Sequence, residues 1–241
     1  MLKVDLHTHT ADDPADRIPH STTQLIDRAA TLGYDALAIT LHDRQLDLRQ
    51  LIPYASERGI VLIPGIERTI QGKHVLLLNF RSGVEEVRTF EDLARLKRRQ
   101  PSGLVVAPHP FFPSSAALGR DLDRHAALFD AVEWNAMFTA ALNFNRRAKR
   151  WATAHGKPLV GNGDVHRLNQ LGTTYSRVDA EPNPDAICAA IAAGRVQVET
   201  RPLSWPHAVQ IIASLFLADV GGGRSMETVA SGRSFAPPAR L

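Results

Sequence analysis

Short apolar runs alternate with longer amphipathic stretches along most of the chain. The apolar runs have the length of buried strands, which we expect at residues 3–6, 36–40, 60–63, 74–80, 103–107, 131–134 and 158–160. Helical spacing of the apolar positions predicts helices at residues 21–32, 46–58, 90–99, 143–155 and 185–193. The order along the chain is therefore mainly strand followed by helix.

Repeated strand and helix units imply parallel pairing of the strands. About seven such units in a chain of 241 residues favour a closed α/β barrel over an open sheet. One exception is the stretch 60–80, where Gln71-Gly72 separates two strand-like runs and predicts a hairpin. Capping candidates for the first helix lie at residues 21–23.

The character of the chain changes after Arg201. Trp205-Pro206 can start an apolar helix over 207–217, which is too short to span a bilayer and is expected to pack on the domain. The stretch from Gly221 onward contains a glycine run and two adjacent prolines and is typical of a flexible tail. We therefore expect a barrel domain over residues 1–203, a packing helix within 204–220 and a flexible tail over 221–241.

The composition is that of an ordinary globular protein, with 44% hydrophobic and 22% charged residues. No segment is typical of a membrane span, and the first residues lack the basic and apolar stretches of a signal peptide, so we expect a cytoplasmic protein that does not enter membranes. The single cysteine, Cys188, excludes an intramolecular disulfide and lies in an apolar helical run, where a buried structural thiol is expected.

The formal net charge of +3 is small. Basic clusters at residues 97–99 and 146–150 are interpreted as solvated helix faces because no aromatic stacking pattern accompanies them. Nucleic acid is therefore not an expected partner, except as a nucleotide or short oligonucleotide substrate. A small phosphorylated ligand is compatible with the charge.

Histidines gather at the ends of the predicted strands. His7 and His9 are two residues apart on the first strand, so their side chains project from the same face and can bind one metal ion. Of the ten histidines, six lie at or just beyond strand ends: His7, His9, His42, His74, His109 and His166. Glu67 and Asp164 follow two further apolar runs. Because the carboxyl ends of barrel strands form one face, we expect these side chains to converge on a multinuclear metal site.

Five segments resemble the motifs of the polymerase and histidinol phosphatase (PHP) superfamily. They are Asp5-Leu6-His7-Thr8-His9-Thr10, Ala38-Ile39-Thr40-Leu41-His42-Asp43, Ile63-Pro64-Gly65-Ile66-Glu67, Ala107-Pro108-His109-Pro110 and Gly163-Asp164-Val165-His166. The resemblance spans roughly residues 1–203. It implies a distorted (β/α)7 barrel that holds two or three divalent ions (Zn, Mn or Fe) at the carboxyl edge of its strands and hydrolyses phosphoesters.

The resemblance also implies a set of metal ligands. A first metal would take His7, His9, Glu67 and Asp164, and a second would share Glu67 and add His74 and His109. A third would use His42, His166 and a residue from the loop after His9, where Asp12, Asp13, Asp16 and His20 are available. Asp16 is favoured there and Asp13 is the alternative. The chain departs from the usual motif at Leu41, where Asp or Asn is common, and Asp43 is a candidate to support His42 instead.

Roles in catalysis follow from the same resemblance. A metal-bound water with a lowered pKa would supply a hydroxide that attacks phosphorus, with Glu67 bridging the ions. A protonated His42 or His166 would supply the proton of the leaving group. The candidate substrate contacts adjoin the ligand motifs or end a strand at the same edge: Arg17, Arg68, Lys73, Asn135 and Arg167. Glu133 also points to this edge and is a candidate to orient a ligand, whereas His125, His155 and His207 are expected to have no catalytic role.

The leading hypothesis is thus a metal-dependent phosphoesterase that acts on a small phosphorylated metabolite or nucleotide. The spacing of Glu67 and His74 resembles the general phosphoesterase branch more than the histidinol phosphatases. An alternative is amidohydrolase-like hydrolysis of a non-phosphate substrate, but the bridging lysine of that class is not found and Glu67 takes its place. A further alternative is a binding module that retains metal without turnover.

Overall fold

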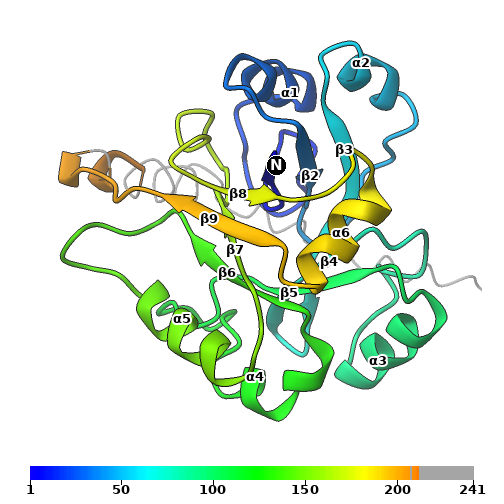
Figure 1. Cartoon of the computed structure of the whole chain (residues 1–241), viewed down its shortest axis with the longest axis vertical. Coiled ribbons are helices and arrows are strands. Elements are labelled where there is room, and N and C mark those ends of the chain that lie inside the picture. Colours follow the sequence, from blue (N-terminus) through cyan, green and yellow to red (C-terminus); the bar gives the residue numbers. More distant parts are fainter. Residues whose placement is uncertain (207, 212–241) are drawn as a thin grey trace, which may run out of the picture.

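The computed structural model describes residues 1–206 and 208–211, and within these ranges nine strands form one sheet in the order β7-β6-β5-β4-β3-β2-β1-β8-β9 (Figure 1). The strands are β1 (Leu2–Asp5), β2 (Ala36–Ile39), β3 (Val61–Ile70), β4 (Lys73–Leu78), β5 (Leu104–Ala107), β6 (Ala131–Asn135), β7 (Leu159–Asn162), β8 (Thr174–Val178) and β9 (Val196–Thr200). The helices are α1 (Thr22–Thr31), α2 (Ile52–Ser56), α3 (Phe90–Arg99), α4 (Asp121–Arg124), α5 (Asn145–Ala154) and α6 (Pro184–Ala192), with a 3-10 turn at Ala126–Leu128.

The sheet curls into a nearly closed barrel, as the α/β pattern predicted. Parallel pairs join β1 to β2, β2 to β3, β5 to β6 and β6 to β7. The two ends of this series meet beyond β1 and β7, where Thr8 forms a parallel bridge with Val165 and the amide of His9 donates to the Val165 carbonyl over 3.0 Å. This contact brings the segment after β1 beside the segment after β7.

The predicted hairpin is confirmed between β3 and β4, which pair antiparallel from Gly65 and Leu78 to Ile70 and Lys73. Gln71 and Gly72 both have positive φ, at 49° and 77°, as a tight hairpin turn of primed type requires. Because β4 is also antiparallel to β5, it interrupts the otherwise parallel series. The structure therefore departs from a simple strand and helix repeat at this point.

The hydrophobic pattern missed a second hairpin, β8 and β9, which pairs antiparallel with the outer side of β1. Every second residue of β8 is partly exposed, among them Tyr175 and Arg177, so the strand does not form an apolar run. Its position depends on a close approach to β7. A Cβ at Gly161 would lie 2.6 Å from the Tyr175 carbonyl oxygen, so only glycine fits there.

The predicted helix over 46–58 is wrong in its length. The structure has a helix only at Ile52–Ser56, with Pro53 in its first turn. Leu48, in the segment before it, is buried, and it packs in the cluster that joins α1 and α2 to the outer face of β2. The apolar residues of this irregular segment are buried although the segment is not helical. Apolar periodicity alone therefore predicts a longer helix than the structure has.

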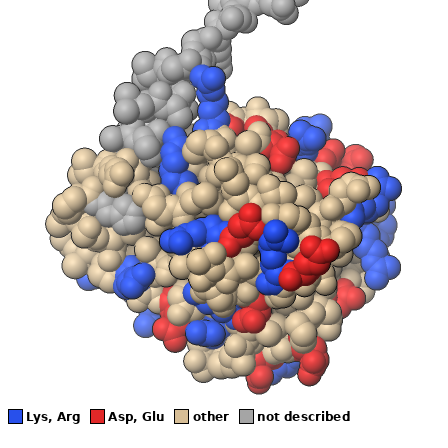
Figure 2. Space-filling model, turned by 90° about the horizontal axis from the view of Figure 1, so that it is seen from above, with Lys and Arg blue, Asp and Glu red and all other residues tan. Residues whose placement is uncertain are grey.

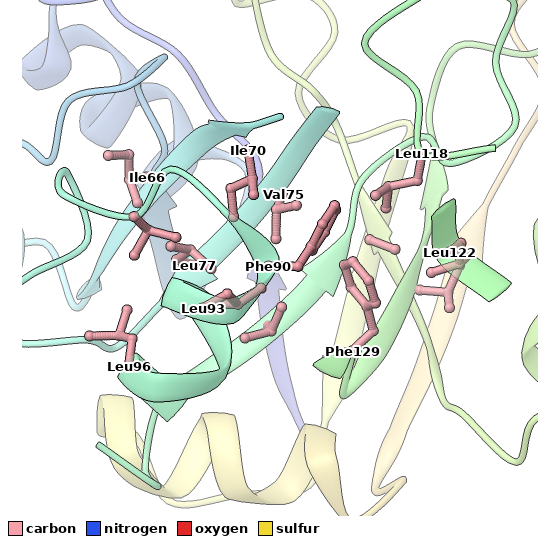
Figure 3. Close-up of a cluster of buried hydrophobic side chains, with 14 of the residues drawn as sticks. Ile66, Ile70, Val75, Leu77, Phe90, Leu93, Leu96, Leu118, Leu122 and Phe129 are labelled. Atoms are coloured by element: carbon pink, nitrogen blue, oxygen red, sulfur yellow. The ribbon is translucent and has the colours of Figure 1, made fainter. Parts of the chain in front are cut away.

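Two further clusters cover the sheet. On the outer face of β3 to β6, α3, α4 and α5 pack over residues such as Ile70, Val75 and Leu77 (Figure 3). The barrel interior is filled by another cluster, which includes Ile187, Cys188 and Ile191 of α6 together with the first residues of β2, β5 and β6. Helix α6 thus seals the amino end of the parallel strands and leaves the carboxyl end for polar residues.

Cys188 lies within this seal, 2% exposed and without a disulfide partner, as predicted. Burial raises the pKa of its thiol to about 12, so the thiol is protonated and does not act as a nucleophile.

Residues 205–206 and 208–211 are helical, and Ala208 and Ile211 pack with Leu203 beside Met137. The rest of the predicted packing helix and the tail over 221–241 lie outside the described residues, as does His207. In the part of the chain that the structure describes, every helix is too short or too polar to cross a bilayer.

Candidate metal centre

Polar side chains from seven strands or the segments that follow them meet at the carboxyl edge of the barrel. His7 and His9 follow β1, His42 follows β2, Glu67 lies in β3 and His74 in β4. On the other side, His109 follows β5, Glu133 and Asn135 end β6, and Asp164 and His166 follow β7. The structure therefore brings together residues that are up to about 160 positions apart, as the barrel topology predicts.

Glu67 lies at the centre of this cluster and is 1% exposed. Its Oε2 atom lies 3.1 Å from His7 Nε2, 3.1 Å from His42 Nε2 and 3.4 Å from His9 Nε2. Its other oxygen, Oε1, faces a different pair of imidazoles.

That second pair consists of His74 and His109. His74 Nδ1 lies 2.8 Å from Glu67 Oε1, and His109 Nε2 lies 3.1 Å from the same oxygen. The two oxygens of one carboxylate are thus each surrounded by separate nitrogen donors. This is the arrangement by which a carboxylate can bridge two ions.

Asp164 adds a second carboxylate on the far side of the first group. Its Oδ1 atom lies 3.4 Å from His7 Nε2, 3.6 Å from His9 Nε2 and 3.5 Å from His166 Nδ1. Asp164 has a φ of 48° and His109 a φ of 28°. Positive φ at a residue other than glycine costs conformational free energy, and such strained positions cluster at functional sites.

The surroundings of His9 show whether this cluster can accept a metal ion. Its Nδ1 bonds to Asp13, but its Nε2 is buried without a hydrogen-bond partner and faces Glu67 and Asp164. A buried polar atom without a partner is costly, and a divalent cation between this nitrogen and the two carboxylates removes that cost. His7, His9 and Glu67 each offer a ligand atom within 4.8 Å of the others, and so do His42, Glu67 and His74. Mixed imidazole and carboxylate donors suit zinc, manganese or iron.

Asp13 is engaged in positioning imidazoles. Its Oδ2 accepts from His9 Nδ1 at 2.9 Å, from His42 Nδ1 at 3.0 Å and from the His42 amide at 3.0 Å. Its Oδ1 accepts from the amides of Ala15 and Asp16. Both oxygens are therefore committed, and the contacts fix the two rings with Nε2 toward Glu67.

Asp16 has a different position. Its Oδ2 lies 3.0 Å from His166 Nε2 and 3.8 Å from His42 Nδ1, and its side chain is 35% exposed. The rings of His42 and His166 are 6.3 Å apart between centroids, and His42 directs Nε2 to Glu67.

The remaining candidates of the loop after His9 make other contacts. Asp12 accepts from the hydroxyl of Thr22, and His20 Nε2 bonds to the His9 carbonyl oxygen. Of the four candidates, Asp16 and Asp13 thus lie at the cluster, and only Asp16 keeps a carboxylate oxygen directed at His166.

Glu133 lies beneath the cluster, with 0% exposure. Its Oε1 lies 2.8 Å from His7 Nδ1 and accepts from Asn162 Nδ2, while its Oε2 accepts from the His109 amide at 2.7 Å and from Asn135 Nδ2. A carboxylate on the far nitrogen of an imidazole orients the ring and fixes its tautomer. Glu133 therefore directs His7 Nε2 toward Glu67 and Asp164.

Known proteins share this fold. Residues 143–196 match a family model described as PHP-associated. The expected resemblance to the PHP superfamily is confirmed. No curated protein sequence matches the chain.

A crystal structure from Bacteroides vulgatus, of a two-domain protein described as containing a predicted PHP-like metal-dependent phosphoesterase, is 18% identical with a TM-score of 0.65. The match covers 89% of this chain and 69% of that one.

Two other solved structures with this PHP-like fold differ in their described activity. The lesion-specific endonuclease EndoQ from Pyrococcus furiosus is 15% identical, with a TM-score of 0.56 over 88% of this chain and 66% of that chain. An amidohydrolase from Chromobacterium violaceum, solved with sulfate and no metal, is 16% identical, with a TM-score of 0.53 over 68% of this chain and 87% of that chain. At sequence identities of 15–18%, the similarity to these structures shows a shared fold and no more.

Within this PHP-like barrel, Arg68 is directed away from the centre. It follows Glu67 in β3, so its side chain projects from the opposite face of the strand. Its Nε donates to the Val87 carbonyl oxygen and its Nη1 pairs with Asp43 at 2.5 Å. Asp43, a candidate to support His42, is thus engaged by Arg68 instead. The strand alternation in the sequence was sufficient to foresee this orientation.

Three other predicted substrate contacts form hydrogen bonds within the protein. Both Asn135 amide hydrogens are directed at carboxylates, those of Glu133 and Asp164. Lys73 Nζ donates to the Ser115 carbonyl oxygen, and Arg167 Nη1 to the His166 carbonyl oxygen.

Two of the histidines expected to have no catalytic role lie outside the centre. His125 stacks on Phe90, and His155 stacks on Trp151. Both rings therefore pack against neighbouring aromatic side chains.

The buried charges of the centre shift one another's ionisation. Burial alone would lower the pKa of His7, but the charges of Asp164, Glu67 and Glu133 raise it well above its ordinary value. Burial alone would raise the pKa of Glu67, but the charge of His7 and the hydrogen bonds of the surrounding imidazoles hold it well below its ordinary value. In the metal-free protein, protons on imidazole thus balance the carboxylates, and metal binding must displace them.

Proposed function

We propose that this chain is a metal-dependent phosphoesterase that hydrolyses a small phosphorylated metabolite or nucleotide. The observation that carries the proposal is the position of buried Glu67, whose two oxygens face separate groups of imidazoles. The PHP-like fold, shared with a structure described as containing a predicted metal-dependent phosphoesterase, supports the same reaction class.

The proposed metal ligands fall into groups around the two carboxylates. His7, His9, Glu67 and Asp164 would hold one ion, and Glu67, His74 and His109 a second. Asp16 and His166, with His42 nearby, are the proposed residues for a third. When bound, such ions lower the pKa of coordinated water and take up negative charge from phosphoryl oxygens.

Side chains at the rim of the centre would handle the substrate. His42 and His166 are 14% and 15% exposed, so each is accessible from outside the cluster. His166 Nε2 lies 3.0 Å from Asp16 Oδ2, where an ionised carboxylate accepts a hydrogen bond from the ring. We propose that His166 or His42, whichever does not bind a metal, donates a proton to the departing oxygen. Arg17 and Arg167, which adjoin Asp16 and His166 in sequence, are the proposed contacts of the phosphate.

A small substrate agrees with the charge distribution. A long nucleic acid is bound mainly through many phosphate contacts, which need a continuous basic track. On the face shown in Figure 2, lysine and arginine side chains are interspersed with acidic ones. The likeness to an endonuclease makes a short oligonucleotide the second substrate class to test.

The alternative function is hydrolysis of a non-phosphate substrate, favoured by the likeness to a structure described as an amidohydrolase. The bridging position is held by Glu67 and not by a lysine. A metal-retaining module without turnover is the remaining alternative. Each makes a different prediction for the same assay.

The test measures bound metal by elemental analysis and phosphate release from a panel of phosphoesters with added manganese. Glu67→Ala and Asp164→Ala are expected to lose metal and to abolish phosphate release, because each removes a charged ligand. Glu57→Ala, an exposed glutamate on the outer surface, is the matched control and is expected to keep both.

Full metal content and turnover in both ligand variants would overturn the proposal. Metal binding without phosphate release from any ester would favour the binding module, and turnover of an amide alone would favour the amidohydrolase alternative.

A further inference from the structure

A cavity of about 760 Å³ lies outside the barrel, away from the candidate metal centre. Its walls come from the start of β1, the end of α1, β8, the end of β9 and the loop 169–173. The volume is in the range of small-molecule sites. Lys3, Arg28 and Arg201 line it, against one carboxylate, that of Glu199.

The arginines at and beside this cavity form no ion pair with a carboxylate of the described residues. Among residues 1–206 and 208–211, Arg28, Arg177 and Arg201 form no ion pair. By contrast, Arg49 pairs with Asp47 and Arg124 with Asp121 on the exposed surface. The positive charge at the cavity is therefore only partly offset by the described chain, through Glu199 in the lining and the charges of Asp35 and Asp5 near Lys3.

Strand register concentrates this charge. Lys3 of β1 is directly opposite Arg177 of β8, so two cations are cross-strand neighbours on one face. Like charges in this position destabilise a sheet. Burial, and then the charges of Arg177 and Arg201, lower the pKa of Lys3. A ligand with negative charge would remove this repulsion.

The ammonium group of Lys3 is held in place without an ion pair, while its backbone amide donates to Asp35. Its Nζ donates to the Leu32 carbonyl oxygen over 2.7 Å and lies 4.3 Å and 4.4 Å from the ring centroids of Tyr34 and Tyr175. The ammonium has three hydrogens, and one is used by Leu32. The amine is thus fixed at the cavity wall with donor capacity remaining.

From these contacts we propose that the cavity is a second binding site, which takes a small molecule carrying phosphate groups and lies apart from the metal centre. Arginine and lysine recognise phosphate through charge-assisted hydrogen bonds, and three such side chains line the cavity. The inference is independent of the proposed function, because it uses none of the proposed metal ligands.

The site is connected to the metal centre by the loop after β7. Asp164 and His166 lie at one end of this loop and Gly172 lines the cavity at the other. Gln170 lies between them, where its Oε1 accepts from the amides of His166 and Arg167. A ligand in the cavity would thus contact the segment that carries two residues of the centre.

The test titrates inorganic phosphate into the full chain, to which zinc has been added beforehand. Amide resonances of Gly172, Thr173 and Tyr175 are followed by NMR during the titration. We expect saturable shifts of these amides, with affinity reduced at least about tenfold in Arg28→Gln/Arg201→Gln, since each arginine contact with an anion contributes about this factor or more.

The matched control is Arg49→Gln/Arg124→Gln, which removes the same charge from exposed arginines elsewhere and is expected to bind like the unmodified chain. Arg28 and Arg201 are exposed, so their double variant is expected to keep its fold, as unshifted core resonances will verify. Equal weakening in both double variants would overturn the site as a non-specific charge effect. Shifts confined to the amides of the metal centre would also overturn it, while leaving the proposed function intact.

Discussion

The two ends of the barrel use the same strands for opposite purposes. At the amino end, α6 covers apolar residues such as Leu104 and Ala131, and Ile187 and Ile191 are 0% exposed. At the carboxyl end the same strands lead into His109, Glu133 and neighbouring residues that are also buried but are ionisable. Burial is therefore offset differently at the two ends: by release of water from apolar surface at the amino end, and by paired charges, to which the proposed metal ions would add, at the carboxyl end.

Removal of metal is expected to have the largest effect and to act on the carboxyl end alone. Chelation should abolish hydrolysis, and manganese or zinc should restore it. Because metal binds only the folded chain, a thousandfold excess over its Kd should add about 4 kcal/mol to the free energy of unfolding. Calorimetry with and without chelator measures this. An unchanged Tm together with full activity after verified metal removal would contradict the metal centre.

A cavity at the amino end should lower stability without changing the chemistry. Ile191→Ala removes a fully buried side chain from the α6 seal and should cost about 2–5 kcal/mol of unfolding free energy, measured by urea denaturation. Metal content per folded molecule should stay the same. Ile52→Ala, at a residue 51% exposed, is the matched control and should cost far less. Loss of metal in Ile191→Ala would show that the two ends are coupled.

Glu133→Gln tests the residue that supports the centre from below. The single oxygen and amide group of glutamine cannot accept from both His7 and the backbone of His109 while also bonding Asn162. Metal affinity should fall about 10–100-fold, measured by competition with a chelating dye. Glu181→Gln, at an exposed position, should leave it unchanged. Equal affinity in both variants would mean that His7 is oriented without this carboxylate.

The smallest expected effect is a pH dependence that differs with and without metal. Burial alone would lower the pKa of His42, but its hydrogen bond with Asp13 and the charge of Glu67 raise it to about 9 in the metal-free protein. The stability from this protonated ring is fully present below its unfolded pKa of about 6.5 and is lost as pH rises through about 9.

A metal ion binds only neutral imidazole, so the stabilisation by bound metal increases as pH rises. The Tm of chelated protein should therefore fall between pH 6.5 and 9, while the increase in Tm on adding metal should grow. A difference in Tm that stays constant over this range would argue against imidazole ligation.

Much of the fold and of the centre could be predicted from local pattern. The apolar runs located six strands within two residues and the start of β3, and Gln71-Gly72 located the hairpin because its backbone needs positive φ at two positions. The convergence of His7, Glu67 and Asp164 followed from their places at strand ends. These features depend on spacing along the chain, which a sequence displays directly.

Other features depended on contacts between distant segments. The hairpin of β8 and β9 contains partly exposed polar residues, so the sequence has no apolar run that would predict its pairing with β1. The different surroundings of Asp13 and Asp16 also depend on distant segments, because Asp13 contacts the Nδ1 atoms of His9 and His42 whereas Asp16 faces His166. Neither the strand pairing nor the carboxylate contacts can be read from residue spacing within one segment.

By itself the sequence determined the alternation of strands and helices and the residue types available at each strand end, because periodicity and side-chain chemistry are local properties. Only the tertiary structure decided which carboxylate faces two groups of imidazoles, which carboxylates orient imidazoles and which cations surround the outer cavity. Closure of the barrel decides these roles, since it sets the distances between side chains on strands that are far apart in the chain.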